Sequence, residues 1–367
     1  MSRSVFMVVA LVVALSVSAS AGSGCIPREP VRVGAILSLT GNGQSFGEAV
    51  RDGMAMAVED VNDAGGIDGR KLELIVADSR TDAQAGVEAF QDMESRYQPL
   101  IYISTLSLNS VVLAPVAEET GVVLVGLVTS APSLTAEREW VYRYYSLAEN
   151  EVSPILSTLE ELGIESLGIL YSSEEYGISV ADKLKEDFED SGGLVKSEPL
   201  GMNEEDFTEQ IGRVTDMDAV YVVGYNNHYE NAFEQLKEAE YDGVVLGAGS
   251  VSNPSIAGLS QSEGVYVAAP RIYEPGFIFA REVAERYEFE YGRTFDHFAA
   301  NGYDAIKIIA ELLKHGEISR RGFRAALDEG FIHPGVLGTI HIEPGNHDIS
   351  FPLYPAQIID GKLEYRY

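Results

Sequence analysis

Short β-rich segments alternate with helical segments along most of this chain, and this alternation restricts the possible folds more than any other feature. Strands joined by helices pair in parallel, and a parallel sheet needs helices on both faces. A first series of strands is predicted at 31–39, 72–78, 100–104 and 122–127. A second series follows at 166–172, 194–200, 218–225 and 244–249. The sequence therefore predicts an α/β fold with two doubly wound, Rossmann-like parallel-sheet lobes.

The predicted helices have one apolar face each. In the helix near 47–63, apolar residues recur at three- and four-residue spacing, which forms one buried stripe. Its members are Val50, Met54, Ala57, Val58 and Val61. Ligands of such folds bind beyond the carboxyl ends of the strands, so two lobes facing each other would enclose a cleft.

The first 25 residues have the features of an export signal. One cation, Arg3, precedes an uncharged apolar run that is too short to span a membrane, and small residues follow it. Two cleavage positions stay open, one after Ala21 and one before Cys25. Cys25 is the single cysteine of the chain and has no disulfide partner, so lipid attachment there competes with an idle thiol. We expect an exported protein, periplasmic or on the cell surface, anchored through Cys25.

The chain is strongly acidic. Its 57 acidic and 26 basic residues give a formal net charge of -31, spread along the whole length. A surface of this kind repels phosphates at long range, so nucleic acids and anionic lipid headgroups are poor partners, and we expect no nucleic acid.

The motifs of several enzyme classes are missing from the sequence. There is no phosphate-binding loop ending in Gly-Lys-Ser/Thr, and the six histidines are scattered. Gly41, Gly43 and Gly47 resemble a dinucleotide-binding turn, with Asp78 as the acid for the ribose. However, Asp78 follows Gly47 by 31 residues rather than about 20. We therefore expect no cofactor, no metal and no catalysis.

Several segments carry a resemblance to a known family. They include "VGAILSLTGNGQSFGEAVRDGMAMAVEDVNDAGGIDGRKLELIVAD", "STLSLNSVVLAPVAEETGVVLVGLVTSAPSLT", "YSSEEYGIS", "DAVYVVGY" and "FAANGYDAIKI". In this order they resemble the branched-chain amino-acid-binding family of periplasmic binding proteins, type I fold. The resemblance implies a receptor that closes on a small-molecule ligand and delivers it to an ABC permease and its ATPase. A sensor that signals to a membrane partner without transport has the same cleft and stays as one alternative, and an exported enzyme on the same scaffold is the other.

The resemblance also implies the domain boundaries. After the leader, 1–25, the N-terminal lobe would contain 30–146 and 272–339, and the C-terminal lobe 147–271 and 340–367. The three hinge segments would lie near residues 146, 271 and 340.

By motif position, the resemblance places a carboxylate site on the N-terminal lobe. It assigns the ligand carboxylate to Ser107, Ser130 and the backbone of Val128. Hydroxyl and amide N–H groups near helix N-termini suit an anion, although the two serines are equally able to cap helices.

The same resemblance implies a pocket for the ligand side chain. Its members would be Phe46, Thr105, Leu106, Tyr176, Tyr225 and Phe298. Where the family places a glutamate that pairs with the ligand ammonium, this chain has Gly249, followed by Ser250. Either another acid replaces that glutamate, with Glu174 and Glu175 as candidates, or the ligand has no ammonium and contacts groups such as Asn226 and Asn227.

Overall fold

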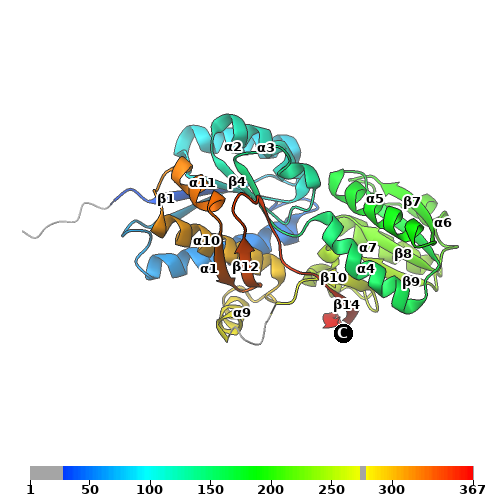
Figure 1. Cartoon of the computed structure of the whole chain (residues 1–367). Coiled ribbons are helices and arrows are strands. Elements are labelled where there is room, and N and C mark those ends of the chain that lie inside the picture. Colours follow the sequence, from blue (N-terminus) through cyan, green and yellow to red (C-terminus); the bar gives the residue numbers. More distant parts are fainter. Residues whose placement is uncertain (1–27, 273–277, 367) are drawn as a thin grey trace, which may run out of the picture.

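The computed structural model describes residues 28–272 and 278–366, which form two α/β lobes side by side (Figure 1). The sheet of the first lobe has six strands in the order β13-β5-β4-β3-β1-β2, all parallel. Its strands are β1 (Val31–Leu37), β2 (Leu72–Asp78), β3 (Ile101–Thr105), β4 (Val123–Leu127), β5 (Val141–Tyr144) and β13 (Asp348–Ile349).

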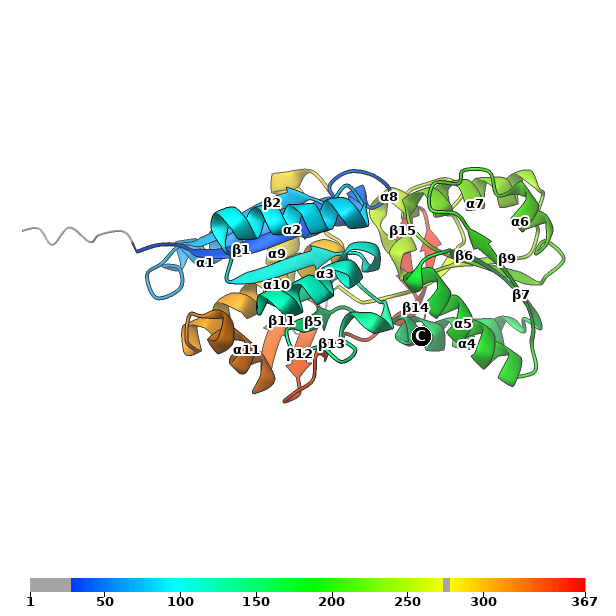
Figure 2. The ribbon, with the colours of Figure 1, turned by 90° about the horizontal axis from the view of Figure 1, so that it is seen from above.

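Helices cover both faces of this sheet, as the two perpendicular views show (Figures 1 and 2). They are α1 (Gln44–Asp63), α2 (Ala83–Tyr97), α3 (Ser107–Thr120), α9 (Ile278–Tyr291), α10 (His297–His315) and α11 (Arg320–Asp328). A 3₁₀ turn, η1 (Pro132–Leu134), follows β4, and a hairpin of β11 (Phe331–Gly335) and β12 (Gly338–Ile342) follows α11.

The sheet of the second lobe has seven strands in the order β15-β14-β10-β9-β8-β6-β7. Five are parallel: β6 (Ser166–Ser172), β7 (Leu194–Leu200), β8 (Ala219–Val223), β9 (Val244–Gly247) and β10 (Tyr266–Ala269). The antiparallel pair β14 (Tyr354–Ile359) and β15 (Lys362–Tyr365) completes it. The helices are α4 (Ala148–Leu162), α5 (Glu175–Asp190), α6 (Thr208–Gly212), α7 (Asn226–Glu238) and α8 (Pro254–Ala257), with the 3₁₀ turn η2 (Gly249–Ser252).

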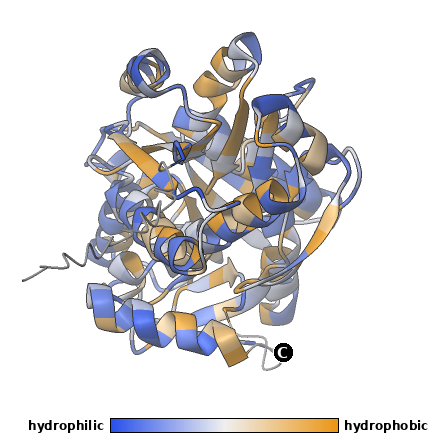
Figure 3. Ribbon diagram, turned by 90° about the vertical axis from the view of Figure 1, so that its left-hand side faces the viewer, coloured by the Kyte–Doolittle hydropathy of each residue, from blue (hydrophilic) through white to orange (hydrophobic). Residues whose placement is uncertain are grey.

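The buried residues lie where the strands and the apolar helix faces meet. All residues of β3, β4 and β8 are buried, as expected for strands covered on both faces. Along the helices, hydrophilic and hydrophobic residues occur together (Figure 3). The stripe predicted on α1 is buried at four of its five positions, and Val58 is partly buried.

The predicted fold class is confirmed, and the strand predictions agree with the structure within two residues at each end. Within the two predicted series of parallel strands, the prediction missed two short strands, β5 and β10. In β5 a charged residue, Arg143, interrupts the apolar pattern, although its side chain is completely buried.

The chain passes between the lobes three times: after β5, after β10, and between β13 and β14. The boundary predicted at residue 340 is wrong. Residue 340 lies inside β12, and β13 pairs in parallel with β5 of the first lobe, with Asp348 opposite Arg143. The first lobe therefore extends to residue 349.

Within the described residues, no helix is both long and apolar enough to cross a bilayer. The predicted leader and its lipid-attachment residue, Cys25, lie outside the described residues.

Candidate ligand-binding site

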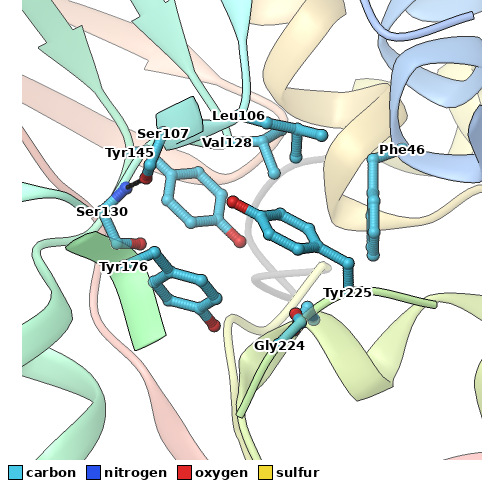
Figure 4. Close-up of a pocket in the computed structure, with 10 residues that line it drawn as sticks. Phe46, Leu106, Ser107, Val128, Ser130, Tyr145, Tyr176, Gly224 and Tyr225 are labelled. Carbon is cyan, nitrogen blue, oxygen red and sulfur yellow. Dashed lines mark hydrogen bonds between the residues drawn. The ribbon is translucent and has the colours of Figure 1, made fainter. Parts of the chain in front are cut away.

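A cavity lies between the two lobes, at the carboxyl ends of their parallel strands (Figure 4). Its free volume is about 20 Å³, room for about one water molecule, so the side chains of the two lobes nearly fill the space between them. It is lined by Phe46, Leu106, Ser107, Val128, Ser130, Tyr145, Tyr176, Gly224, Tyr225 and Ser250. The residues from Phe46 to Ser130 belong to the first lobe, Tyr145 lies in the segment that leaves it, and the residues from Tyr176 to Ser250 belong to the second lobe.

Three helices begin at the cavity wall. Ser107 is the first residue of α3, Tyr176 is the second of α5, and Tyr225 precedes α7 as its N-cap. Helix N-termini present unpaired N–H groups and a partial positive charge, which favours an anionic ligand group. Because none of the lining residues is a lysine or arginine, an anion here would depend on such groups and on hydroxyls.

Ser107 connects the ends of two neighbouring strands. Its Oγ accepts hydrogen bonds from the backbone N–H groups of Ser130 and Ala131, at 3.2 Å each; the first is drawn in Figure 4. In the part of the chain that the structure describes, we find no acceptor for the Ser107 hydroxyl proton. That proton remains available to a ligand carboxylate.

Leu106 and Val128, at the ends of β3 and β4, have strained backbones. Their φ angles are +68° and +51°, in a region that is unfavourable for L-residues and most of all for a β-branched one. Strain of this kind costs roughly 1–3 kcal/mol per residue and is concentrated at functional sites. Both residues line the cavity, so the strained turns direct the strand ends toward it.

Arg143 holds the loop that carries Ser130, a role that the sequence analysis missed. Its Nη1 donates to the carbonyl groups of Thr129 and Ala131, at 3.0 and 2.9 Å. Its Nε donates to Asp348 at 2.7 Å. The buried guanidinium thereby fixes both neighbours of Ser130 and ties β13 to the sheet.

Aromatic rings form much of the remaining wall. Tyr176 and Tyr225 approach each other from the second lobe with ring centroids 6.2 Å apart. In the view of Figure 4, Phe46 stands beside Tyr225, on the side away from Tyr176. Tyr145, which lies between β5 and α4, was not predicted; its hydroxyl is 3.3 Å from Nε2 of His297.

Three predicted site residues do not line the cavity. Thr105 lies behind it, and its hydroxyl accepts from the Ser38 N–H at 3.1 Å. Phe298 packs edge-to-face behind Phe46, with centroids 5.0 Å apart, and so supports the wall from outside. Gly249 does not line the cavity, and its backbone N–H donates to a carboxylate of α4.

That carboxylate belongs to Glu151, which the sequence analysis did not single out. Glu151 Oε2 accepts from the Gly249 N–H at 3.0 Å. A Cβ added to Gly249 would lie 3.7 Å from this oxygen. Gly249, the first residue of η2 after β9, therefore has no acidic side chain of its own but lies next to the carboxylate of Glu151 from α4.

The two glutamates named as substitutes have other contacts. Glu174 caps α5 by accepting from the N–H of Tyr176 at 3.0 Å and from Ser172 Oγ at 2.6 Å. Glu175 reaches across to the first lobe and accepts from the Ser133 N–H and Oγ at 2.9 and 2.6 Å. Neither carboxylate lines the cavity, and the expectation that one of them meets the ligand is not supported.

Other hydrogen bonds also join the rims of the lobes. Asn226 donates to Ser45 Oγ at 2.9 Å, and Asn42 donates to the Met202 carbonyl at 3.0 Å. Together with Glu175 and Ser133, these contacts hold the lobes closed over the cavity. Asn226 thus belongs to the rim.

The glycine-rich segment after β1 has a structural explanation. Asp78 accepts from the N–H groups of Leu39, Thr40 and Arg80 at 2.7–3.2 Å, so it fixes the loop instead of facing a ribose. No group of three or more potential metal ligands occurs in the described ranges, 28–272 and 278–366.

A family model described as "periplasmic binding protein" matches residues 30–362, which include both lobes. The chain belongs to the periplasmic binding protein family. Membership of this family implies a location outside the cytoplasm. The relatives of this periplasmic binding protein are described as binding proteins, not as enzymes.

Individual relatives are distant. The leucine-, isoleucine-, valine-, threonine- and alanine-binding protein of Pseudomonas aeruginosa is 25% identical over 244 residues, 64% of this chain and 65% of that protein. The alignment thus spans slightly less than two thirds of that relative's length.

Solved structures share the fold. A leucine-binding protein of Thermotoga maritima has a TM-score of 0.84 at 21% identity, covering 92% of this chain and 98% of that one. A solute-binding protein of an ABC transporter from Rhodopseudomonas palustris, in complex with 3,4-dihydroxybenzoic acid, has a TM-score of 0.80 at 20% identity, covering 92% and 95%. The likeness confirms the type I fold and leaves the ligand open.

Glu151 is expected to make the stability of this binding protein depend on pH. Burial raises the pKa of its carboxyl from 4.5 to about 7, although the Gly249 N–H lowers it. The folded state therefore holds the proton more tightly than the unfolded state. The resulting stabilisation is complete below pH 4.5 and is lost as the pH rises through about 7. At about 1.36 kcal/mol per pKa unit, this amounts to about 3 kcal/mol.

The measurement compares the wild type with Glu151→Gln in urea unfolding at about pH 5 and about pH 8. Between these values the wild type should lose about 2.5 kcal/mol relative to the variant, because at pH 5 part of the effect is already lost. Asp296, whose pKa burial raises to about 7, and His297, whose pKa burial lowers to about 3, are present in both proteins, so their contributions cancel. Parallel pH profiles would contradict the prediction.

Proposed function

We propose that this protein is the extracytoplasmic receptor of an ABC importer. It captures a small polar organic ligand, an amino acid or a related carboxylate or amide, between its lobes and delivers it to a membrane permease driven by an ATPase. A lipid on Cys25 would keep the receptor near that permease. The receptor itself makes and breaks no covalent bond in the ligand.

The observation that carries the proposal is the closed cavity with walls from both lobes. Its residues come from segments separated by more than a hundred positions, such as Phe46 of α1 and Tyr176 of α5, and the rims are joined by direct hydrogen bonds. A ligand can enter only when these contacts open. Binding and closure are thus coupled, and a permease that binds the closed form would distinguish the loaded receptor from the empty one.

Native mass spectrometry of the purified protein tests this proposal by identifying any retained small molecule. Thermal-shift titration with amino acids, their deaminated analogues and amides then ranks the ligand classes, because a ligand that binds the folded state raises the unfolding temperature. Absence of any retained molecule together with no shift from any of these compounds would contradict the proposal.

Replacing Ser107 with alanine is expected to weaken a carboxylate ligand by about tenfold or more, since a hydrogen bond to a charged group contributes roughly 1.5–3 kcal/mol. Isothermal titration calorimetry measures this loss. The matched control is Ser157→Ala, on the exposed side of α4, which should bind like the wild type. An unchanged affinity of Ser107→Ala would remove this hydroxyl from the site.

A further inference from the structure

His297 lies buried between the two lobes. It is the first residue of α10 in the first lobe and is 2% exposed. Its Nε2 is 3.3 Å from the hydroxyl oxygen of Tyr145, and its Nδ1 is 3.3 Å from Oγ of Ser252. Tyr145 lines the cavity where the chain leaves the first lobe, and Ser252 is the last residue of η2 in the second. The imidazole ring therefore connects the cavity wall to the opposite lobe.

The surrounding groups allow one protonation state of this ring. Ser252 Oγ donates its only proton to the carbonyl oxygen of Gly249. Ser252 therefore accepts from the Nδ1–H of His297, and a neutral imidazole has no second proton. Its Nε2 is left as the acceptor for the Tyr145 hydroxyl. The result is one directed chain of hydrogen bonds from the cavity wall to the second lobe.

A second proton on His297 would break this chain. Both nitrogens of an imidazolium donate, so the Tyr145 hydroxyl would have to turn its own proton away. The charge would also be buried without a partner, since the histidines that meet a carboxylate within residues 28–272 and 278–366 are His333 and His347. Burial accordingly lowers the pKa of His297 from 6.5 to about 3.

Charged groups around the ring belong to α1, α4 and the segment before α10. They are Glu48, Asp52, Glu151, Arg293 and Asp296. Arg293 pairs with the two acids of α1. Burial raises the pKa of Glu151 and of Asp296 to about 7, so acid neutralises these two carboxyls. Their response to acid is opposite to that of His297, and a comparison of variants is needed to remove it.

Opening of the lobes changes the surroundings of the ring. His297 belongs to the first lobe, whereas Ser252 moves away with the second. Water then reaches the imidazole, which regains its ordinary pKa of about 6.5. The open form therefore binds a proton that the closed form excludes, and acid favours the open form through this residue.

We propose that His297 is a positioning residue that couples closure of the lobes to the release of a proton, so that acid weakens the hold on the ligand through this ring. This inference rests on the proposed receptor function and adds a regulation of the same site. Above about pH 6.5 closure is unaffected. Below it each pH unit weakens closure by up to about tenfold, until the closed form also binds the proton near pH 3.

The experiment measures dissociation constants by calorimetry at about pH 7.5 and about pH 5. The probe is the compound that gives the largest thermal shift at the higher pH among the amino acids, their deaminated analogues and the amides. Two substitutions remove the titrating ring: His297→Asn, whose amide still donates to Ser252, and His297→Gln, whose amide still meets Tyr145. The matched control is His315→Asn, at the exposed end of the same helix.

Between these two pH values, the wild type and His315→Asn should lose about thirtyfold in affinity relative to His297→Asn and His297→Gln. The contributions of Glu151, of Asp296 and of the probe itself are the same in all four proteins, so they cancel. A histidine that only supports the fold would weaken binding of its variants equally at both pH values.

The outcomes separate the two proposals. If the probe binds and the pH profiles of the wild type and the His297 variants are parallel within about threefold, the role of His297 is wrong and the receptor function stands. If no compound of these sets binds to the wild type at the higher pH, the proposed ligand class fails together with this inference.

If neither His297 variant folds, nitrogen NMR of the histidine rings in the wild type decides. With the probe bound at about pH 5, one ring should be neutral with its proton on Nδ1, and it should become charged when the probe is removed. The other deeply buried histidine, His228, is distinguished by its proton on Nε2, because its Nδ1 accepts from the Tyr225 N–H. Absence of such a ring would contradict the proposal.

Discussion

Replacing Arg143 with methionine is expected to lower the free energy of unfolding by about 3 kcal/mol and to weaken ligand binding. The substitution leaves the carbonyl groups of Thr129 and Ala131 without their donor inside the protein, and each unsatisfied buried group costs about 1–3 kcal/mol. Asp348 also loses its partner, but its side chain is one-third exposed, so water compensates part of that loss.

The loss of binding follows from the position of the same two carbonyl groups. They flank Ser130, whose N–H is held by Ser107, so a loop released by the substitution moves one wall of the cavity. Guanidinium chloride unfolding measures the first effect, and calorimetry well below the unfolding temperature measures the second. The control is Arg213→Met, on the surface of the second lobe, where the ion pairs with Glu198 and Glu209 are solvated and their loss should leave both quantities unchanged. Equal effects of the two substitutions would contradict the special role of Arg143.

Replacing Gly47 with alanine is expected to lower the free energy of unfolding by about 1–3 kcal/mol and to disturb the cavity. A Cβ at this position would lie 2.0 Å from the Ser38 carbonyl oxygen and 2.5 Å from its carbon, so the start of α1 has to move away from β1. Phe46 precedes Gly47 and is part of the cavity wall. The movement therefore shifts an aromatic side chain that would contact the ligand.

The matched control is Gly212→Ala, because a Cβ at Gly212, the last residue of α6, meets no atom within 4 Å. Alanine is favoured over glycine in helices, so this variant should be as stable as the wild type or slightly more so. Thermal unfolding and ligand titration of both variants measure the two effects. A Gly47→Ala protein with wild-type stability and affinity would show that α1 adjusts to the methyl group.

Gly47 also explains why the segment after β1 resembles a dinucleotide-binding turn. In both cases a glycine allows a helix to start close to the strand before it. Here the close approach positions Phe46 at the cavity, while Asp78 holds the loop through backbone N–H groups. The same local geometry serves a different ligand class, and only the surroundings of the turn distinguish the two.

The sequence by itself determined the two parallel sheets and most of the cavity wall. Periodicity located the strands, because burial on both faces imposes apolar runs that are visible locally. By motif position, the resemblance assigned residues such as Ser107, Tyr176 and Tyr225 to the site, and these lie together at the cavity. The resemblance also assigned Thr105 and Phe298, but these two residues lie behind the residues that line the cavity. Sequence position does not show which of two neighbouring residues faces the ligand.

Only the tertiary structure decided the groups that approach from distant parts of the chain. Arg143 bonds to Asp348 across 205 positions, and Glu151 meets Gly249 across 98. In the sequence, Arg143 interrupts a strand pattern and Glu151 is one of many acids in an acidic chain. Their roles arise from burial, which removes water and makes each charge depend on the particular groups that folding brings beside it.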